Sequence, residues 1–131
     1  MTDSRSVVKI SLFLQAFCLM FVLGTQQKFY DSKYDYFDID SLVQNPRLLR
    51  NYMDCFLDKG PCTPIGRVFK IALPEVIATS CSKCTPAQRS FAKRTFGAFR
   101  RDLPELNEEL KKHLDPGNKH FDKFEKTIVN A

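Results

Sequence analysis

The 131-residue sequence contains no tryptophan, few glycines, only two histidines and no Asn-x-Ser/Thr site. Its seven prolines and five glycines exclude a collagen-like or glycine-rich linker composition. Without an Asn-x-Ser/Thr site, no N-glycosylation is expected. Alternating strand patterns are almost absent, which disfavours a β-sheet fold. The remaining composition, 44% hydrophobic and 27% charged, is that of an ordinary globular protein, and the length allows one small domain.

Side chains that commonly carry catalysis are also sparse. His113 and His120 belong to no H-E-x-x-H or related motif, so a zinc-protease site is not expected. No glycine-rich loop that could hold a phosphate occurs. The acidic residues between Asp31 and Asp40 lack the glycine and terminal glutamate of a calcium-binding EF-hand loop. We therefore expect the protein not to be an enzyme, and we expect neither a metal nor a cofactor.

One long uncharged segment occurs, at residues 10–23, and Arg5 and Lys9 precede it. As a helix it would span about 21 Å, less than the ~30 Å of a hydrocarbon core. A basic start, a short apolar stretch and small residues just after it are typical of a secretory signal. No other apolar run could cross a bilayer, so no stable membrane insertion is expected.

Val22 and Gly24 suit the −3 and −1 positions of a cleavage site, which predicts a signal peptide at residues 1–24 and a mature domain at 25–131. A signal anchor is the alternative. Cleavage would remove Cys18 and leave an even number of cysteines. In a secreted chain of this size, four cysteines indicate two disulfides. The sequence therefore predicts a secreted, extracellular protein.

The other cysteines follow the spacing C-x6-C, eighteen residues, C-x2-C: Cys55, Cys62, Cys81 and Cys84. Three pairings are possible in principle. Each close pair falls at an expected helix end or turn, where a local bridge is geometrically feasible and would contribute about 2 to 2.5 kcal/mol. A four-cysteine zinc site and a redox-active C-x-x-C pair are the alternatives. The secretory signal disfavours zinc, and the lack of a βαβ pattern disfavours the redox pair, so structural disulfides are the preferred interpretation.

Helix start signals recur at short intervals, and each is followed by apolar residues at helical spacing. Residues 45–46, 63–64 and 85–86 each combine a capping side chain with a proline suited to the first helical position. Pro104 starts a further helix, and apolar residues near the C-terminus indicate a last one. Pro74 predicts a break in the second of these helices. The pattern predicts an all-α single domain of about six short amphipathic helices.

Five basic residues form a strip on the helix expected to start at Pro86: Arg89, Lys93, Arg94, Arg100 and Arg101. A nucleic-acid-binding protein would place such a strip against phosphates. Nucleic-acid binding is not expected, because the net charge of +5 is modest and a secreted chain rarely meets nucleic acid. Such a strip is usually the solvent-exposed face of a helix. The alternative is that it binds an acidic partner surface or an anionic lipid head group.

Short motifs surround the cysteines: Lys33-Tyr34-Asp35, Arg47-Leu48-Leu49 with Tyr52, Asp58-Lys59-Gly60-Pro61-Cys62-Thr63-Pro64 with Gly66, Leu73-Pro74, Lys83 and Asp115-Pro116. Together with the cysteine spacing, they cover the chain from Tyr30 to about Phe124. In this combination the sequence resembles the insect chemosensory protein family, also called the OS-D-like or A10 family.

The resemblance implies a six-helix domain around an apolar channel for long-chain lipophiles, with neighbouring cysteines bridged. Family tyrosines at the positions of Tyr34 and Tyr52 line or gate that channel. We expect nine residues to contact the ligand, the first of them near the mouth: Tyr34, Ile39, Leu49, Tyr52, Phe69, Leu73, Ile77, Phe96 and Leu106.

The function that we expect is non-covalent carriage of a small lipophile, such as a fatty acid, alcohol or ester, by a monomeric protein. Burying a ten-carbon tail offers roughly 8 kcal/mol gross, and the entropy lost on binding reduces this to an affinity on the order of micromolar. The alternative is a secreted effector, salivary or developmental, that acts through its surface on a receptor or host protein. The basic strip motivates it, as does Asn107, where family members commonly carry tryptophan or tyrosine.

Overall fold

The computed structural model describes residues 29–130, so the predicted signal peptide lies outside the described part of the chain. Residues 29–130 form one short 3-10 helix and six α-helices, without a strand. None of these helices is both long and apolar enough to cross a membrane. The predicted all-α fold class is confirmed.

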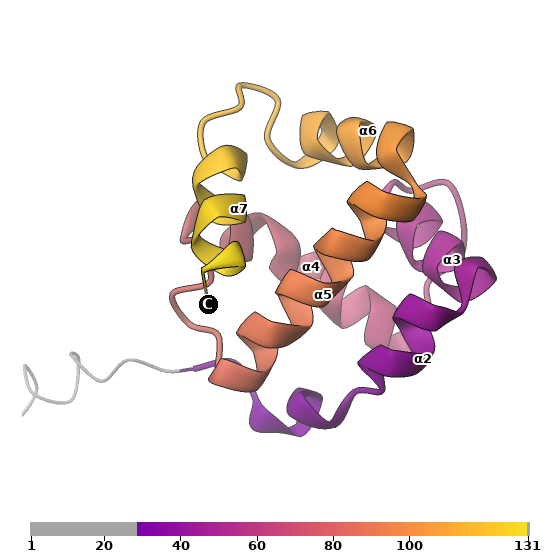
Figure 1. The fold of residues 1–131 in the computed structure, drawn as a ribbon, viewed down its shortest axis with the longest axis horizontal. Helices are drawn as coiled ribbons and strands as arrows, with labels where there is room; N and C mark the ends of the chain where they lie inside the picture. Colours follow the sequence, from indigo (N-terminus) through magenta and orange to yellow (C-terminus); the bar gives the residue numbers. More distant parts are fainter. Residues whose placement is uncertain (1–28, 131) are drawn as a thin grey trace, which may run out of the picture.

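The elements are η1 (Ser32–Tyr36), α2 (Ile39–Gln44), α3 (Pro46–Phe56), α4 (Pro64–Ala78), α5 (Pro86–Asp102), α6 (Pro104–Leu114) and α7 (Phe121–Val129). Figure 1 shows α5 crossing the middle of the molecule, with α2 and α3 on one side, α7 on the other and α4 behind. Helix α5 contacts η1, α2, α3, α6 and α7. It is therefore the central helix, against which most other elements pack.

Three helices, α3, α4 and α5, begin at the positions that the pairs of a capping residue and a proline predicted. The side-chain oxygens of Asn45 and Thr63 each accept a hydrogen bond from the backbone N–H three residues later, at 3.1 and 3.0 Å. At the start of α5 the capping is reciprocal: the Thr85 hydroxyl accepts from the N–H of Gln88 at 3.2 Å, and the Gln88 side chain accepts from the N–H of Thr85 at 3.1 Å. These bonds satisfy N–H groups that the first turn of a helix leaves unpaired.

The prediction of a helix break at Pro74 is wrong, because α4 continues through it from Pro64 to Ala78. Proline has no N–H, so the carbonyl of Lys70, one turn earlier, lacks its usual helical partner. The following turn is held by packing instead: Ile77 and Cys81 are 2% and 0% exposed. The burial of these side chains stabilises the C-terminal end of α4 by more than the missing hydrogen bond destabilises it.

Two disulfides join neighbouring cysteines, Cys55 to Cys62 and Cys81 to Cys84. The first connects the end of α3 to the loop before α4, and the second closes the turn between α4 and α5. In that turn Ser80 and Cys81 have φ angles of 52° and 63°, a left-handed conformation that non-glycine residues rarely adopt. The predicted local pairing is confirmed, and each bridge constrains the turn between two helices.

The core between α5 and α7 consists largely of phenylalanine. Phe96, Phe99, Phe121 and Phe124 are at most 3% exposed. The Phe96 ring meets Phe99, Phe121 and Phe124 edge to face, with centroid distances of 5.7, 5.7 and 5.2 Å. Such pairs contribute about 0.5–1.5 kcal/mol each beyond their area of burial. Aromatic packing therefore holds the last helix against the central one.

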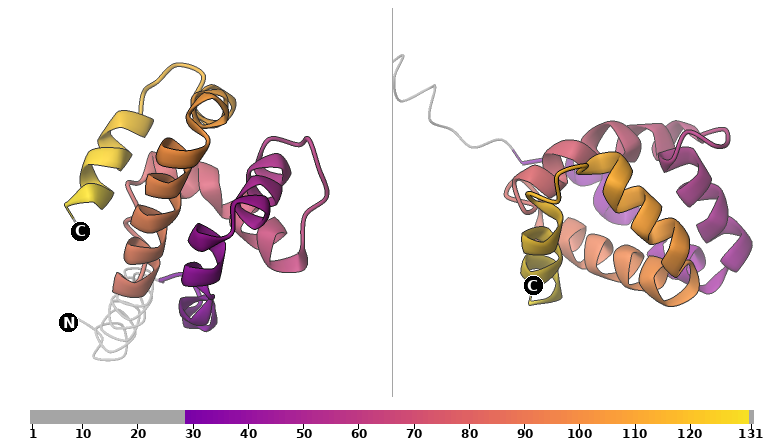
Figure 2. Two further views of the ribbon diagram at one scale, coloured as in Figure 1. Left: turned by 45° about the vertical axis from the view of Figure 1, so that its right-hand side comes forward. Right: turned by 90° about the horizontal axis from the view of Figure 1, so that it is seen from above.

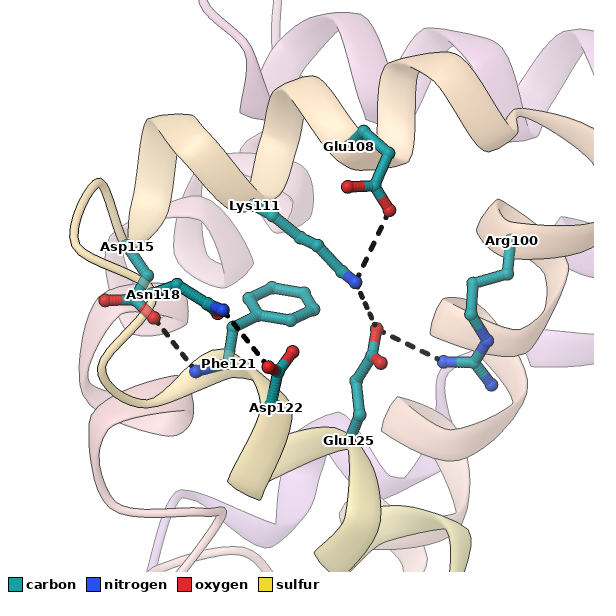
Figure 3. Close-up of polar contacts among 8 residues, drawn as sticks. All are labelled: Arg100, Glu108, Lys111, Asp115, Asn118, Phe121, Asp122 and Glu125. Atoms are coloured by element: carbon teal, nitrogen blue, oxygen red, sulfur yellow. Dashed lines mark hydrogen bonds and ion pairs between the residues drawn. The ribbon is translucent and has the colours of Figure 1, made fainter.

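The N-terminus of α7 is capped from the preceding loop. His120, its N-cap residue, makes no side-chain cap bond. The Asp115 carboxylate instead accepts from the backbone N–H groups of Lys119 and His120 at 3.1 and 2.9 Å. It also accepts from the N–H of Phe121 at 2.9 Å (Figure 3). These hydrogen bonds, the one from His120 above all, favour the charged form and lower the pKa of Asp115. One carboxylate therefore fixes where α7 begins.

Farther along α7, Glu125 connects three helices. Its Oε1 lies 3.6 Å from Nζ of Lys111 on α6 and 3.5 Å from Nη1 of Arg100 on α5 (Figure 3). Lys111 also pairs with Glu108 at 3.4 Å. The Lys111 and Glu125 side chains are 22% and 20% exposed, so water screens this group less than it screens an exposed pair.

Replacing Asp115 by asparagine should lower the melting temperature at pH 7 by on the order of 5 °C. The carboxylate accepts hydrogen bonds with both oxygens, whereas the amide has one acceptor oxygen and no negative charge to favour a helix N-terminus. Because folding lowers the pKa of Asp115 below its ordinary 3.8, the stabilisation is present above that value and is lost as the pH falls through the folded-state pKa. The two melting temperatures should therefore converge as the pH falls below 3.8. Circular dichroism melts from pH 7 down to pH 2 measure this.

The matched control is Asp122→Asn, in the first turn of the same helix, where the carboxylate accepts one hydrogen bond, from Asn118 at 3.1 Å. Its melting temperature should change less than that of Asp115→Asn. A Tm difference for Asp115→Asn that is the same at pH 2 as at pH 7 would contradict the capping role.

Candidate ligand-binding cavity

An apolar cavity of about 150 Å³ lies beneath the N-terminal segment, between α3, α4 and α5. Its walls include Phe56 of α3, Phe69 and Leu73 of α4, and Phe91 and Phe96 of α5. Helices α2 and η1 lie beside α5 (Figure 2). Almost all of the surface facing the cavity belongs to carbon atoms. A lining of this composition favours apolar ligands.

Aromatic rings from three helices and the N-terminal segment meet on one side of the cavity. The Phe69 ring contacts those of Tyr34, Phe37 and Phe91, with centroid distances of 6.0, 5.4 and 5.1 Å. Phe37 also meets Phe91 at 5.3 Å and Tyr52 of α3 at 5.9 Å. These edge contacts join α3, α4, α5 and the N-terminal segment on this side of the cavity.

Hydrogen bonds hold the N-terminal segment 30–36 over the cavity. The N–H of Tyr30 donates to the carbonyl of Lys83 at 2.9 Å. The hydroxyl of Thr85, which caps α5, donates to the Asp35 carboxylate at 2.9 Å. Both anchor points lie in or next to the turn closed by the second disulfide. The position of this segment therefore depends on the turn between α4 and α5.

Two lining hydroxyls are of chemical interest. Burial, and to a lesser degree the nearby Glu75 carboxylate, raises the pKa of Tyr30 to about 12, so this phenol is neutral at physiological pH. Thr95 is 5% exposed, and its hydroxyl has no hydrogen-bond partner within residues 29–130. Thr127, also helical, does bond to the carbonyl one turn earlier, of Lys123, at 2.8 Å. Thr95 is therefore an unpaired polar group beside an apolar cavity.

Five of the nine residues predicted to contact a ligand line the cavity: Tyr34, Tyr52, Phe69, Leu73 and Phe96. The other four lie outside its lining: Ile39, Leu49, Ile77 and Leu106. Leu49 and Ile77 are buried in the core, and Ile39 and Leu106 are partly buried against it. Helical periodicity shows that a side chain faces inward, but it does not distinguish core from cavity. Ligand contact by these residues stays a prediction.

Several lining residues were not predicted from the sequence. Phe91 of α5 lines the cavity because its ring lies opposite that of Phe69. Val76 lines the cavity because α4 continues past Pro74. The disulfide-bonded turn, through Cys81 and Cys84, also contributes to the lining, and no local sequence signal could have placed it there.

The basic strip carries less free charge than the sequence suggested. Arg94, Arg100 and Arg101 each pair with a carboxylate of the same chain. Arg100 in addition helps to hold α7 through Glu125. Action on a receptor or host protein through this strip stays a prediction. In the described part of the chain, no group of three or more potential metal ligands converges.

Thr95→Val should raise the free energy of unfolding by about 1 kcal/mol, because it removes a buried hydroxyl that lacks a hydrogen-bond partner and retains the shape of the side chain. Urea unfolding of the ligand-free protein measures this change. Thr127→Val is the control, since it removes a hydroxyl that is hydrogen-bonded, and it should give no increase. A lower stability of Thr95→Val than of wild type would show that its hydroxyl is paired.

The chain matches a family and several known proteins. A family model described as "Insect pheromone-binding family, A10/OS-D" matches residues 30–122. The chain is 37% identical over 120 residues to Allergen Tha p 1 of Thaumetopoea pityocampa, covering 92% of this chain and 95% of that protein. It is 32% identical over 118 residues to ejaculatory bulb-specific protein 3 of Drosophila melanogaster, covering 90% and 94%.

Among solved structures, the fold is similar to that of a chemosensory protein in complex with bromo-dodecanol. The sequence identity is 33% and the TM-score is 0.67, and the match covers 74% of this chain and 97% of the other. The similarity therefore extends over nearly the whole of that solved domain.

Proposed function

Because the chain belongs to the insect pheromone-binding family A10/OS-D, we propose that it is a secreted carrier that binds a small lipophile non-covalently in the cavity beneath its N-terminal segment. The membership confirms the resemblance of the cysteine-centred motifs. The family is one of binding proteins, in line with the expectation that the protein is not an enzyme.

The apolar cavity is the observation that carries this proposal. It exists in the folded domain, so a ligand enters without unfolding the helices around it. Its lining of carbon atoms favours apolar ligands, because about 0.8 kcal/mol is gained for each CH₂ group transferred from water. A solved relative with 33% identity holds bromo-dodecanol, which supports a long-chain alcohol as a ligand of this chain.

The size of the cavity indicates how a long ligand would be accommodated. An engineered cavity of about 150 Å³ in another protein binds benzene, which is smaller than a twelve-carbon chain. A longer ligand therefore requires side chains to move. Tyr34 and Phe69, both partly buried, lie on the side covered by the N-terminal segment, and rotation of their rings would lengthen the cavity. Side-chain rearrangements of this kind are common on binding.

Two features support secretion. The basic start and short apolar run within residues 1–24 are typical of a signal peptide. The two disulfides form and persist in oxidising, extracellular surroundings. A carrier in extracellular fluid would solubilise a lipophile that is poorly soluble in water.

Dodecanol should displace an apolar fluorescent probe, N-phenyl-1-naphthylamine, with a Kd on the order of micromolar. Ala92→Leu should weaken dodecanol binding at least about tenfold, because Ala92 lines the cavity and a leucine there would occupy its volume. Fluorescence titration of probe and competitor measures both effects.

Ala87→Leu is the matched control, since Ala87 is exposed on the same helix and does not line the cavity. It should bind dodecanol as wild type does. No displacement at tens of micromolar dodecanol would exclude the carrier function, and unchanged binding by Ala92→Leu would place the ligand elsewhere.

A further inference from the structure

We propose that the cavity selects an uncharged lipophile, such as an alcohol or an ester, over a fatty-acid anion of the same chain length. This inference rests on the proposed carrier function and specifies the chemical class of its ligand. The sequence analysis named fatty acids, alcohols and esters together as expected ligands, and this proposal ranks alcohols and esters above the ionised acids.

The charge of the lining residues is the first observation. Within residues 29–130, no lysine, arginine or histidine lines the cavity, and the one charged lining residue is Asp31. A carboxylate entering these surroundings would lose hydration without gaining a cation as a partner. An unpaired ionised carboxylate is strongly disfavoured in apolar surroundings, and the negative charge of Asp31 adds repulsion.

Two lysines that adjoin the cavity lining in sequence, Lys33 and Lys83, already have partners. Nζ of Lys33 lies 3.7 Å from the Asp31 carboxylate and 5.1 Å from the centre of the Tyr34 ring. Nζ of Lys83, in the disulfide-bonded turn, lies 2.6 Å from the Glu75 carboxylate. A ligand carboxylate would have to compete with these protein carboxylates for each cation.

The positive residues on α5 do not provide a cation for a ligand carboxylate in the cavity. Arg89 and Lys93 directly follow the lining residues Gln88 and Ala92 in sequence, and Arg94 directly precedes Thr95, but none of the three basic residues lines the cavity. Successive side chains on a helix point about 100° apart. Arg94 is in addition paired with Asp40. The positive charge of α5 is therefore not presented to a ligand in the cavity.

Neutral polar groups, in contrast, are present along the lining. Tyr34 and Thr95 belong to it, and their hydroxyls can exchange hydrogen bonds with an alcohol or an ester carbonyl. A neutral head group is also less costly to desolvate than a carboxylate. The lining therefore offers partners to an uncharged ligand and none of opposite charge to an anion.

The direct test compares dodecanol, methyl dodecanoate and dodecanoate on the wild-type protein at pH 8, where the acid is ionised. Competition against N-phenyl-1-naphthylamine gives the three dissociation constants. Dodecanol and the ester should each bind at least about tenfold more tightly than dodecanoate. Equal affinities, or tighter binding of dodecanoate, would overturn the selection and leave the carrier function intact. If none of the three ligands binds, both proposals fall.

A cation introduced at the rim should rescue the anion. Val68 lines the cavity and is 37% exposed, so the aliphatic stem of a lysine there can lie along apolar surface while its ammonium remains in water. Val68→Lys should raise the affinity for dodecanoate about tenfold relative to the affinity for dodecanol. Ile71→Lys is the matched control, one turn later on α4, 74% exposed and outside the lining, and it should change neither.

Asp31→Asn provides a second, less disruptive variant. Asp31 caps η1 by accepting from the N–H of Lys33 at 3.0 Å, and asparagine can make the same cap. Loss of the negative charge should tighten dodecanoate binding several-fold relative to dodecanol binding. If neither Asp31→Asn nor a folded Val68→Lys improves dodecanoate binding, as judged with circular dichroism spectra of both, the lining charge does not determine selectivity.

Discussion

The contact between the Phe96 ring and those of Phe121 and Phe124 is the interaction on which the structure most depends. Phe96 belongs at the same time to the core beneath α7 and to the wall of the cavity. If α7 did not pack against it, the inner wall of the cavity would be open to water. The helix farthest along the sequence therefore closes a cavity to which it contributes no lining residue.

Charged groups support this packing from the periphery. Asp115 determines where α7 begins, and Glu125 joins α7 to Lys111 and Arg100 on the neighbouring helices. Other ion pairs, such as Lys59 with Glu109 and Arg94 with Asp40, also join different segments outside the cavity lining. The interior can then remain apolar, which suits a ligand whose binding depends on transfer of hydrocarbon out of water.

Sequence patterns predicted the features of the fold that depend on neighbouring residues. Capping side chains followed by proline located the starts of α3, α4 and α5, because such caps act within one turn of helix. The close spacing of Cys55 with Cys62 made a local bridge feasible, and the family resemblance implied it. Pro74 was misjudged because the rule for proline considers one missing hydrogen bond, whereas burial of Ile77 and Cys81 holds the helix beyond it.

By itself, the sequence determined the family, the all-α class, the disulfide partners and which helix faces point inward. Tertiary structure alone decided which inward residues face a cavity and which fill the core: Tyr52 lines it, whereas Leu49 on the same helix does not. It also brought Phe91 opposite Phe69 and left the Thr95 hydroxyl unpaired. The physical reason is that periodicity describes one helix at a time, while an empty volume exists only where side chains from several helices fail to meet.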